Sequence, residues 1–319
     1  MFAASFHFFL RVAGSSLKTA GIFCLCFFLA PSCAVAAGTA DSPDAELKPF
    51  LRAVDGLHAR LGWTDISAAG VSWEHHRATR SSRPLIFARF GASSGNCILF
   101  LGGVHGDERP TVYLMLKLAQ YLHQHPQTLK DQCVVIAPLV NPDGYFATPP
   151  TRVNASGVDL NRNFPTRDWN RDADRRWRTK SRKNRRYHPG TKAGSEPETL
   201  FQVALIKRFQ PQKILSVHSP LNFFDYDGPS SDLDSFEQWM ETVSKEANHP
   251  LKKFGYYPGS LGNYAGHERN IFTLTLELPS SDPKQAPTYF QQFFPAFLKF
   301  IHLPVAGTPP FTRLVKHGK

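Results

Sequence analysis

Two short runs of apolar residues limit the possible folds of this chain more than any other feature. Cys97–Leu101 reads Cys-Ile-Leu-Phe-Leu, and Cys133–Ala137 reads Cys-Val-Val-Ile-Ala. Neither run alternates with polar residues, which is typical of strands that are covered on both faces. A segment with helical patterning follows the first run, and a longer segment separates the second run from the next expected helix. The sequence therefore predicts an α/β fold, with a largely parallel sheet and helices on both of its faces.

The remaining elements are expected to continue this alternation. A helix opens at Pro43, and Ser195-Glu-Pro-Glu198 fits a capping box that begins a further helix. A long segment rich in Asn, Arg, Gly and Pro covers residues 141–194. The expected strands are 70–79, 84–90, 97–101, 133–137, 214–217 and 272–276, and the expected helices after the first are 110–123, 195–209, 232–247 and 286–301. We divide the chain into residues 1–37, 38–83 (a first helix and extended segment), 84–303 (the main domain) and 304–319 (a tail).

The first 37 residues have the pattern of a secretory signal peptide. Their only basic residues other than His are Arg11 and Lys18, an apolar stretch covers residues 20–30, and Ala34-Val-Ala36 fits a cleavage site. No apolar run reaches the roughly 18 residues that a transmembrane helix needs, so an integral membrane protein is excluded. An N-terminal anchor, a buried helix and lipid attachment at Cys33 are the alternatives. We expect cleavage and export, to the periplasm.

The chain is basic, which favours acidic partners. Its 319 residues include 37 Lys and Arg against 26 Asp and Glu, a net charge of +11. Cleavage would remove two positive charges and leave 11 − 2 = +9. Nine of the cations lie between Arg175 and Lys192, either as a solvated loop or as a rim that attracts an anionic polymer of the cell envelope. Export argues against nucleic acid as the partner.

Four side chains with metal and acid–base chemistry fall at or just after the ends of expected strands. His105 and Glu108 follow the expected strand at 97–101. His218 follows the expected strand at 214–217, and Glu277 follows the one at 272–276. Ligand sites in open α/β sheets lie beyond the carboxyl ends of the strands. Two His and one Glu are the ligands of a catalytic zinc with an open fourth position, which leaves Glu277 free as the general base. Gly91-Ala-Ser-Ser-Gly95 matches a serine hydrolase motif, but a strand follows it where that motif requires a helix.

In order along the chain, four motifs resemble the zinc carboxypeptidase family. They are His105-Gly-Asp-Glu108, Gly157-Val-Asp-Leu-Asn-Arg-Asn-Phe-Pro165, Ser216-Val-His218 and Thr275-Leu-Glu277-Leu-Pro279. The resemblance covers residues 84 to 300 and implies a single domain with a mixed, largely parallel eight-stranded sheet. Within the family, Gly194-Ser-Glu-Pro-Glu-Thr199 and Pro258-Gly-Ser-Leu-Gly262 are most similar to the murein peptide amidase branch.

The resemblance implies a role for each matching residue. One Zn²⁺ per chain would be held by His105, Glu108 and His218, with Glu277 as the general base. Arg152 would stabilise the developing oxyanion, and Asp159 would orient a zinc-bound His. Asn161 and Arg162 would clamp the terminal carboxylate of the substrate. A turn residue is the alternative for Asp159, and a solvated side chain is the alternative for Arg152.

Three further positions depart from the family pattern or match it less closely. Asp107 replaces an arginine of the digestive members, and we expect it to pair with an ammonium group of the substrate. The mobile tyrosine of the family falls near Tyr256, with Tyr257 and Tyr264 close by, and ordinary aromatic packing is the alternative for each. Leu261 falls at the position of the side-chain pocket.

The branch implies hydrolysis of the γ-D-glutamyl–meso-diaminopimelate amide in peptidoglycan tripeptides. Longer stem peptides and peptides that carry Lys in place of diaminopimelate are expected to be poorer substrates. One alternative is an exported zinc carboxypeptidase that acts on ordinary peptides. The other is a catalytically silent binding module on the same fold, which the retention of all four chemical positions disfavours.

After cleavage of the signal segment, two cysteines would remain. Cys97 lies eight residues before His105, and Cys133 lies eight residues before Asn141. The family's sheet places these two strands side by side, at a spacing compatible with a disulfide. We therefore expect a Cys97–Cys133 disulfide, with two free buried thiols as the alternative.

Overall fold

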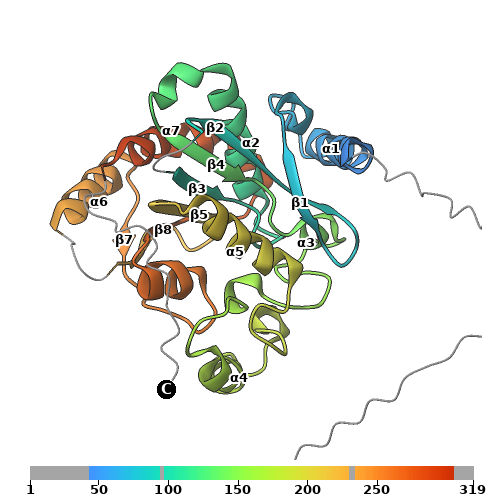
Figure 1. Cartoon of the computed structure of the whole chain (residues 1–319), viewed down its shortest axis with the longest axis vertical. Coiled ribbons are helices and arrows are strands. Elements are labelled where there is room, and N and C mark those ends of the chain that lie inside the picture. Colours follow the sequence, from blue (N-terminus) through green and yellow to red (C-terminus); the bar gives the residue numbers. More distant parts are fainter. Residues whose placement is uncertain (1–42, 94–96, 230–233, 305–319) are drawn as a thin grey trace, which may run out of the picture. The chain divides into compact units, whose positions relative to one another are not determined.

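The computed structural model describes residues 43–93, 97–229 and 234–304 (Figure 1). The expected signal segment 1–37, the possible lipid site Cys33 and residues 305–319 of the expected tail lie outside the described residues. Within the described ranges, no helix is both long enough and apolar enough to cross a bilayer.

The described strands form one mixed sheet of eight strands with the order β1-β2-β4-β3-β5-β8-β6-β7. The four central strands, β4, β3, β5 and β8, run parallel to one another. The pairs β1–β2, β2–β4 and β6–β8 are antiparallel, which agrees with the mixed sheet expected from the sequence. The bounds are β1 Glu74–Ala78, β2 Pro84–Gly91, β3 Cys97–Leu101, β4 Cys133–Ala137, β5 Lys213–His218, β6 Phe223–Gly228, β7 Leu251–Lys252 and β8 Phe272–Glu277.

The α-helices connect and cover these strands. Their bounds are α1 Pro43–Arg60, α2 Arg109–Gln124, α3 Pro142–Phe146, α4 Trp169–Thr179, α5 Pro197–Phe209, α6 Asp234–Glu246 and α7 Ala286–His302. α3 and α4 lie within residues 141–194, for which no helix or strand is expected from the sequence. The strands β6 and β7 are not expected either. The capping box at 195–198 is wrong. Glu196 is the N-cap of α5 without a side-chain capping bond, and the carboxylate of Glu198 instead accepts a hydrogen bond from Asn154.

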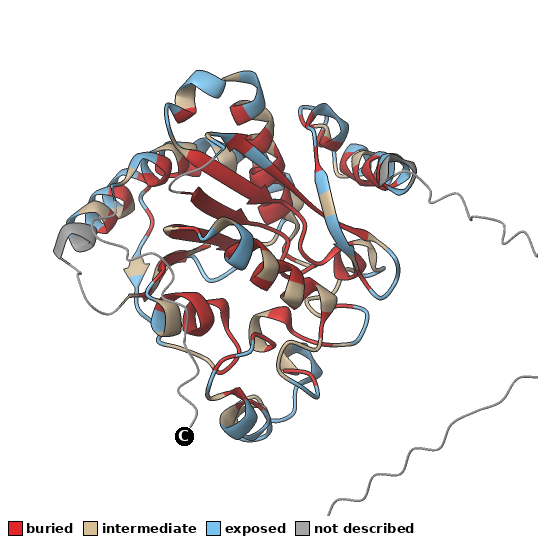
Figure 2. Cartoon of the chain, in the orientation of Figure 1, coloured by how far each residue is buried: buried red, intermediate tan, exposed pale blue. Residues whose placement is uncertain are grey.

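Alternation along the central strands divides the core into two layers. On β3, Ile98 and Phe100 pack in one cluster with α1, α2, α6 and α7, whereas Leu99 and Leu101 pack in a second cluster with α5. Figure 2 shows β3 and β4 buried along their whole length. Successive side chains of a strand point to opposite faces, so a continuous apolar run fills both layers.

A tight contact between two loops lies beyond the carboxyl ends of β3 and β4. A Cβ atom added to Gly106 would lie 2.1 Å from the backbone of Gly144, closer than any real Cβ contact. Glycine at position 106 therefore allows the loop that carries His105 and Glu108 to pack directly on the start of α3. Asn141 caps α3, since its side chain accepts a hydrogen bond from the Gly144 amide at 2.9 Å.

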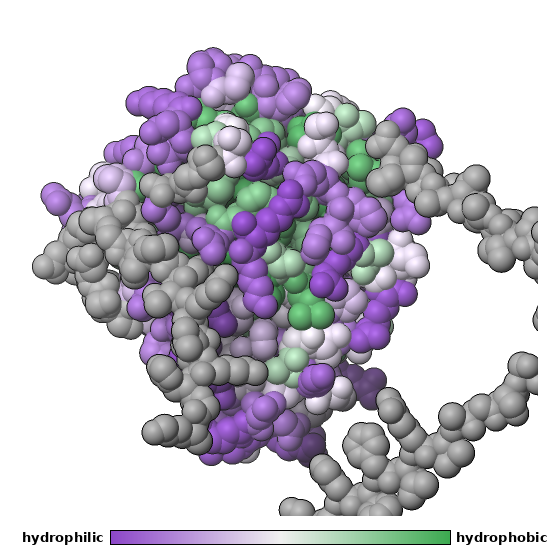
Figure 3. Space-filling model, in the orientation of Figure 1, coloured by the Kyte–Doolittle hydropathy of each residue, from purple (hydrophilic) through white to green (hydrophobic). Residues whose placement is uncertain are grey.

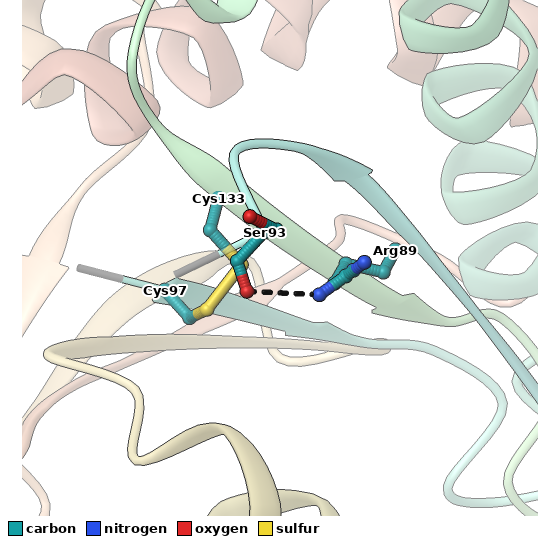
Figure 4. The surroundings of a disulfide bond; sticks show 4 residues. All are labelled: Arg89, Ser93, Cys97 and Cys133. Atoms are coloured by element: carbon teal, nitrogen blue, oxygen red, sulfur yellow. Dashed lines mark hydrogen bonds between the residues drawn. A yellow bond between two sulfur atoms is a disulfide. The ribbon is translucent and has the colours of Figure 1, made fainter. Parts of the chain in front are cut away.

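The Cys97–Cys133 disulfide is confirmed. The two residues are register partners at the starts of the parallel strands β3 and β4, with their Cα atoms 4.4 Å apart. In Figure 4 the bond lies beside the turn in which Arg89 donates a hydrogen bond to the carbonyl of Ser93. The disulfide therefore joins the strands at the ends opposite to those that lead into the loop of His105 and Glu108 and into α3.

Candidate metal centre

Two imidazoles and a carboxylate converge at the carboxyl ends of β3 and β5. The Nδ1 atom of His105 lies 2.8 Å from Glu108 Oε1 and 3.1 Å from His218 Nδ1, and His218 Nδ1 lies 3.1 Å from Glu108 Oε2. All three residues are buried, and their ligand atoms lie within 4.8 Å of one another. This donor set fits a zinc ion, which prefers nitrogen and carboxylate oxygen ligands in tetrahedral sites.

The outer edge of each imidazole is fixed by a hydrogen bond. His105 Nε2 lies 3.1 Å from Asp159 Oδ1, and His218 Nε2 lies 3.0 Å from the hydroxyl of Ser216. These contacts leave both Nδ1 atoms directed at the centre, which is how proteins set the tautomer of a metal-binding His. Sequence reasoning did not single out Ser216 for this contact. The signal was present, because residues two apart on a strand share a face.

The charge of the centre is balanced by Arg152. Its Nε donates to Asp159 Oδ2 at 2.9 Å, and its Nη1 donates to Glu108 Oε1 at 3.2 Å. Burial alone would raise the pKa of Glu108, but its contacts with His105 and His218 outweigh burial and hold the pKa below the ordinary range. Glu108 therefore stays anionic and able to bind a cation.

Glu277 lies at the end of β8, in register with His218 on β5. Its side chain lines the same cleft as His105 and His218, and its Oε2 accepts a long hydrogen bond of 3.4 Å from the Leu221 amide. Burial raises the pKa of Glu277 above that of an ordinary glutamate, against the opposing charge of His218. A carboxylate of raised basicity beside a metal site is suited to take a proton from water.

Asn161 and Arg162 line this cleft, which has a volume of about 470 Å³. Asn161 Oδ1 accepts a hydrogen bond from the Leu261 amide at 2.8 Å, and Leu261 also lines the cleft. The Arg162 guanidinium stacks on Tyr257, 4.4 Å from the ring centroid. The cleft therefore presents a fixed guanidinium near the centre, as recognition of a carboxylate requires.

Two expected substrate contacts have other partners. The Asp107 carboxylate forms an ion pair with Arg186, and Asp107 is not among the described residues that line the cleft. Tyr256 stacks on His267, with ring centroids 4.5 Å apart, and borders a separate surface hollow. Its neighbour Tyr257 lines the cleft instead, whereas Tyr264 is buried against Phe164. Adjacent residues point in different directions, so sequence position alone did not distinguish them.

Sequence reasoning missed two acidic residues of the cleft, Asp225 and Asp227. Both lie on β6 and line the cleft with Thr275 and Glu277. Asp225 accepts a hydrogen bond from the Phe254 amide at 3.0 Å, and Asp227 accepts one from the Thr275 hydroxyl at 2.8 Å. Burial, reinforced by the charge of Asp225, raises the pKa of Asp227 to about 8. The alternation in Phe-Phe-Asp-Tyr-Asp, with acids two residues apart on one face, was the available signal.

A family model described as zinc carboxypeptidase matches residues 78–296. Murein peptide amidase A of Escherichia coli strain K12 is 36% identical over 216 residues, which are 66% of this chain and 83% of that protein. The Vibrio campbellii protein of the same name is 31% identical over 222 residues, 68% of this chain and 82% of that protein.

Solved structures agree with this match. The structure of murein-tripeptide amidase from Escherichia coli O157 aligns with a TM-score of 0.53 at 27% identity, over 74% of this chain and 94% of that one. Bovine thrombin-activatable fibrinolysis inhibitor aligns with a TM-score of 0.58 at 20% identity, over 81% and 96% of the two chains, which is a likeness of fold.

Proposed function

The chain belongs to the zinc carboxypeptidase family, and from this premise we propose that it removes meso-diaminopimelate from γ-D-glutamyl linkages of peptidoglycan tripeptides. The family is zinc-dependent, and the His-Glu-His group supports one zinc ion per chain. The observation that carries the substrate proposal is the pair of acids, Asp225 and Asp227, in the same cleft as Arg162.

Each catalytic role rests on a position within the cleft. A bound zinc ion supplies the Lewis acidity that activates water for attack on an amide. Glu277 takes the proton of the attacking water and then delivers it to the departing amine, since its carboxylate is partly buried and of raised basicity. Arg152 faces the centre with a guanidinium that can donate to the carbonyl oxygen as negative charge develops. Asp159 holds both Arg152 and His105 in place.

The charges of the cleft suit a C-terminal residue with a free carboxylate and a cationic side chain. Arg162, with Asn161, holds the carboxylate next to the scissile amide. A following D-Ala would convert this carboxylate to an amide, so tripeptides are preferred over longer stems. The acids Asp225 and Asp227 form no ion pair with any described Lys or Arg. The carboxyl oxygens of Asp225 and Asp227 can accept hydrogen bonds from an ammonium group of the substrate, a role for which Asp107 is already occupied by Arg186.

Competition between defined peptides tests the proposal. Zinc-loaded protein is mixed with the diaminopimelate tripeptide, the corresponding tetrapeptide and a tripeptide that ends in Lys, and the products are identified by mass. We expect the diaminopimelate tripeptide to react fastest, and chelator-treated protein to release nothing. Equal rates on the three peptides, or faster hydrolysis of α-linked peptides, would favour a general carboxypeptidase. A zinc-loaded protein that binds these peptides without cleaving them would favour a silent binding module.

Export is the second part of the proposal and is supported by the signal pattern of the first 37 residues. A C-terminally tagged chain expressed in a Gram-negative host is expected in the periplasmic fraction, shortened by about this segment. Full-length protein in the cytoplasmic fraction would contradict export without affecting the assignment of the substrate.

A further inference from the structure

One face of α4 borders the cleft with positive charge. Ala173, Arg176 and Trp177 of α4 and Lys180, which caps its C-terminus, all line the cleft. Their spacing of three, four and seven residues places them on one side of a helix. Figure 3 shows hydrophilic side chains gathered over α4 at the bottom of that view. The basic stretch expected from the sequence therefore divides into cations directed at the cleft and cations directed at solvent.

Arg176 differs from the other arginines of α4 in having no carboxylate partner. Asp172 pairs with Arg171 at 2.8 Å and with Arg175 at 2.6 Å, and Asp174 pairs with Arg178 at 2.6 Å. No carboxylate within the described ranges forms an ion pair with Arg176. Its guanidinium is nevertheless held in place, because it stacks on Tyr257 at 4.3 Å from the ring centroid.

Arg162 stacks on the same ring, at 4.4 Å from its centroid. Neither of these two arginines forms an ion pair with a described carboxylate, although cations at partly buried positions usually do, and Arg162 Nη1 instead donates to the Asn161 carbonyl at 2.6 Å. Each guanidinium presents a planar set of N–H donors that matches a carboxylate. One aromatic ring therefore holds two guanidinium groups in a single cleft, each able to receive a carboxylate.

We propose that Arg176 binds a second carboxylate of the substrate, the one at the far end of the side chain of its C-terminal residue. This inference rests on the proposed function, in which Arg162 holds the carboxylate next to the scissile amide. The cleft then selects a residue with two carboxylates and a side-chain ammonium group, since the carboxyl oxygens of Asp225 and Asp227 line the same cleft and can accept from that ammonium. A C-terminal Lys satisfies the acids but leaves Arg176 unpaired.

The test compares three peptides that differ in a single amide. The first is the diaminopimelate tripeptide, the second has the distal carboxylate of diaminopimelate amidated, and the third has the α-carboxylate of D-Glu amidated. Zinc-loaded wild type, Arg176→Gln and Arg178→Gln are assayed on each. Arg178 is the matched control because it lies on the same helix, pairs with Asp174 and does not line the cleft.

We expect the wild type and R178Q to prefer the first peptide over the second by about tenfold or more in kcat/KM, mainly through KM. R176Q should hydrolyse these two peptides equally while treating the third as the wild type does. Calorimetry should show that free diaminopimelate binds the wild type more tightly than its distal monoamide, and that R176Q binds both alike.

Several outcomes would overturn the role of Arg176. An equal loss by R176Q on the first two peptides would indicate a structural effect, and no loss on either would show that Arg176 is not used. If R176Q instead loses only the wild-type preference for the first peptide over the third, Arg176 binds the α-carboxylate of D-Glu. Equal wild-type rates on the first two peptides would refute the Arg176 proposal alone, whereas wild-type inactivity on all three would refute the proposed function with it.

Discussion

Nε2 of His105 lies 3.1 Å from Oδ1 of Asp159, across the imidazole ring from the nitrogen that faces Glu108 and His218. The other oxygen of Asp159 accepts from Arg152 at 2.9 Å. A single buried carboxylate thus orients a candidate ligand and a candidate oxyanion donor. The geometry of the centre depends on this residue, although Asp159 is not itself a ligand.

Asp159→Asn should weaken zinc binding by about 10- to 100-fold, because the amide holds the His105 ring less strongly and removes one of the two anionic partners of Arg152. Competition with a chromogenic chelator measures the affinity. Asp174→Asn, at an exposed position of α4, is the control and should bind zinc as the wild type does. Unchanged affinity in D159N would contradict the orienting role.

Glu277→Gln should retain zinc and lose turnover. The side chain is outside the His-Glu-His group, so metal content measured by atomic absorption should stay at one ion per chain. The amide cannot take a proton from water, and removal of a general base costs about 10²- to 10⁴-fold in kcat. Near-normal turnover in E277Q would show that another group is the base.

Glu198 should make the chain less stable as the pH rises. Burial raises its pKa from 4.5 to about 7, against the hydrogen bond from Asn154. Between these values the folded chain holds a proton that the unfolded chain has released, so stability falls as the pH rises from 4.5 to about 7 and stays low above it.

Glu198→Gln removes this penalty while keeping the shape of the side chain. The variant should exceed the wild type in free energy of unfolding by about 3 kcal/mol at pH 8, with no difference near pH 4. Urea denaturation at the two pH values measures the difference. Glu46→Gln, on the exposed side of α1, is the control. A gain in E198Q that is the same at both pH values would exclude titration as its cause.

Replacement of both Cys97 and Cys133 by Ser should lower the free energy of unfolding by about 3–4 kcal/mol, since the bond closes a loop with a sequence separation of 36. Denaturant midpoints of the variant and of oxidised and reduced wild type give the value. The reduced wild type should match the variant. Two titratable thiols in unfolded, unreduced protein would contradict the disulfide.

The sequence predicted those parts of the fold that are buried on both sides. The strands at 97–101 and 133–137 have no polar position, and the structure places both in the centre of the sheet with the expected bounds. The residues that follow these strands converge because parallel strands end at one edge of a sheet. Such elements are predictable because a single physical requirement, complete burial, fixes every position.

The missed elements depend on contacts between distant parts of the chain. α4 is rich in arginine and is held by a few apolar contacts, of which the buried residues Trp169 and Ala173 are examples, so its sequence shows no broad apolar stripe. β6 carries two acids on the cleft face, and Asp225 and Asp227 become part of a site only when β6 pairs with β8. Asp107 was expected to meet substrate, but its partner Arg186 lies 79 residues away in the sequence.

The disulfide joins the starts of β3 and β4, whereas the chemically active loops leave the other ends of these strands. Reduction should therefore make the chain easier to unfold without displacing His105 or Glu108. Activity in a reducing extract would say nothing about where the chain resides in the cell. The oxidation state of Cys97 and Cys133 would instead serve as a chemical record of the compartment in which each molecule folded.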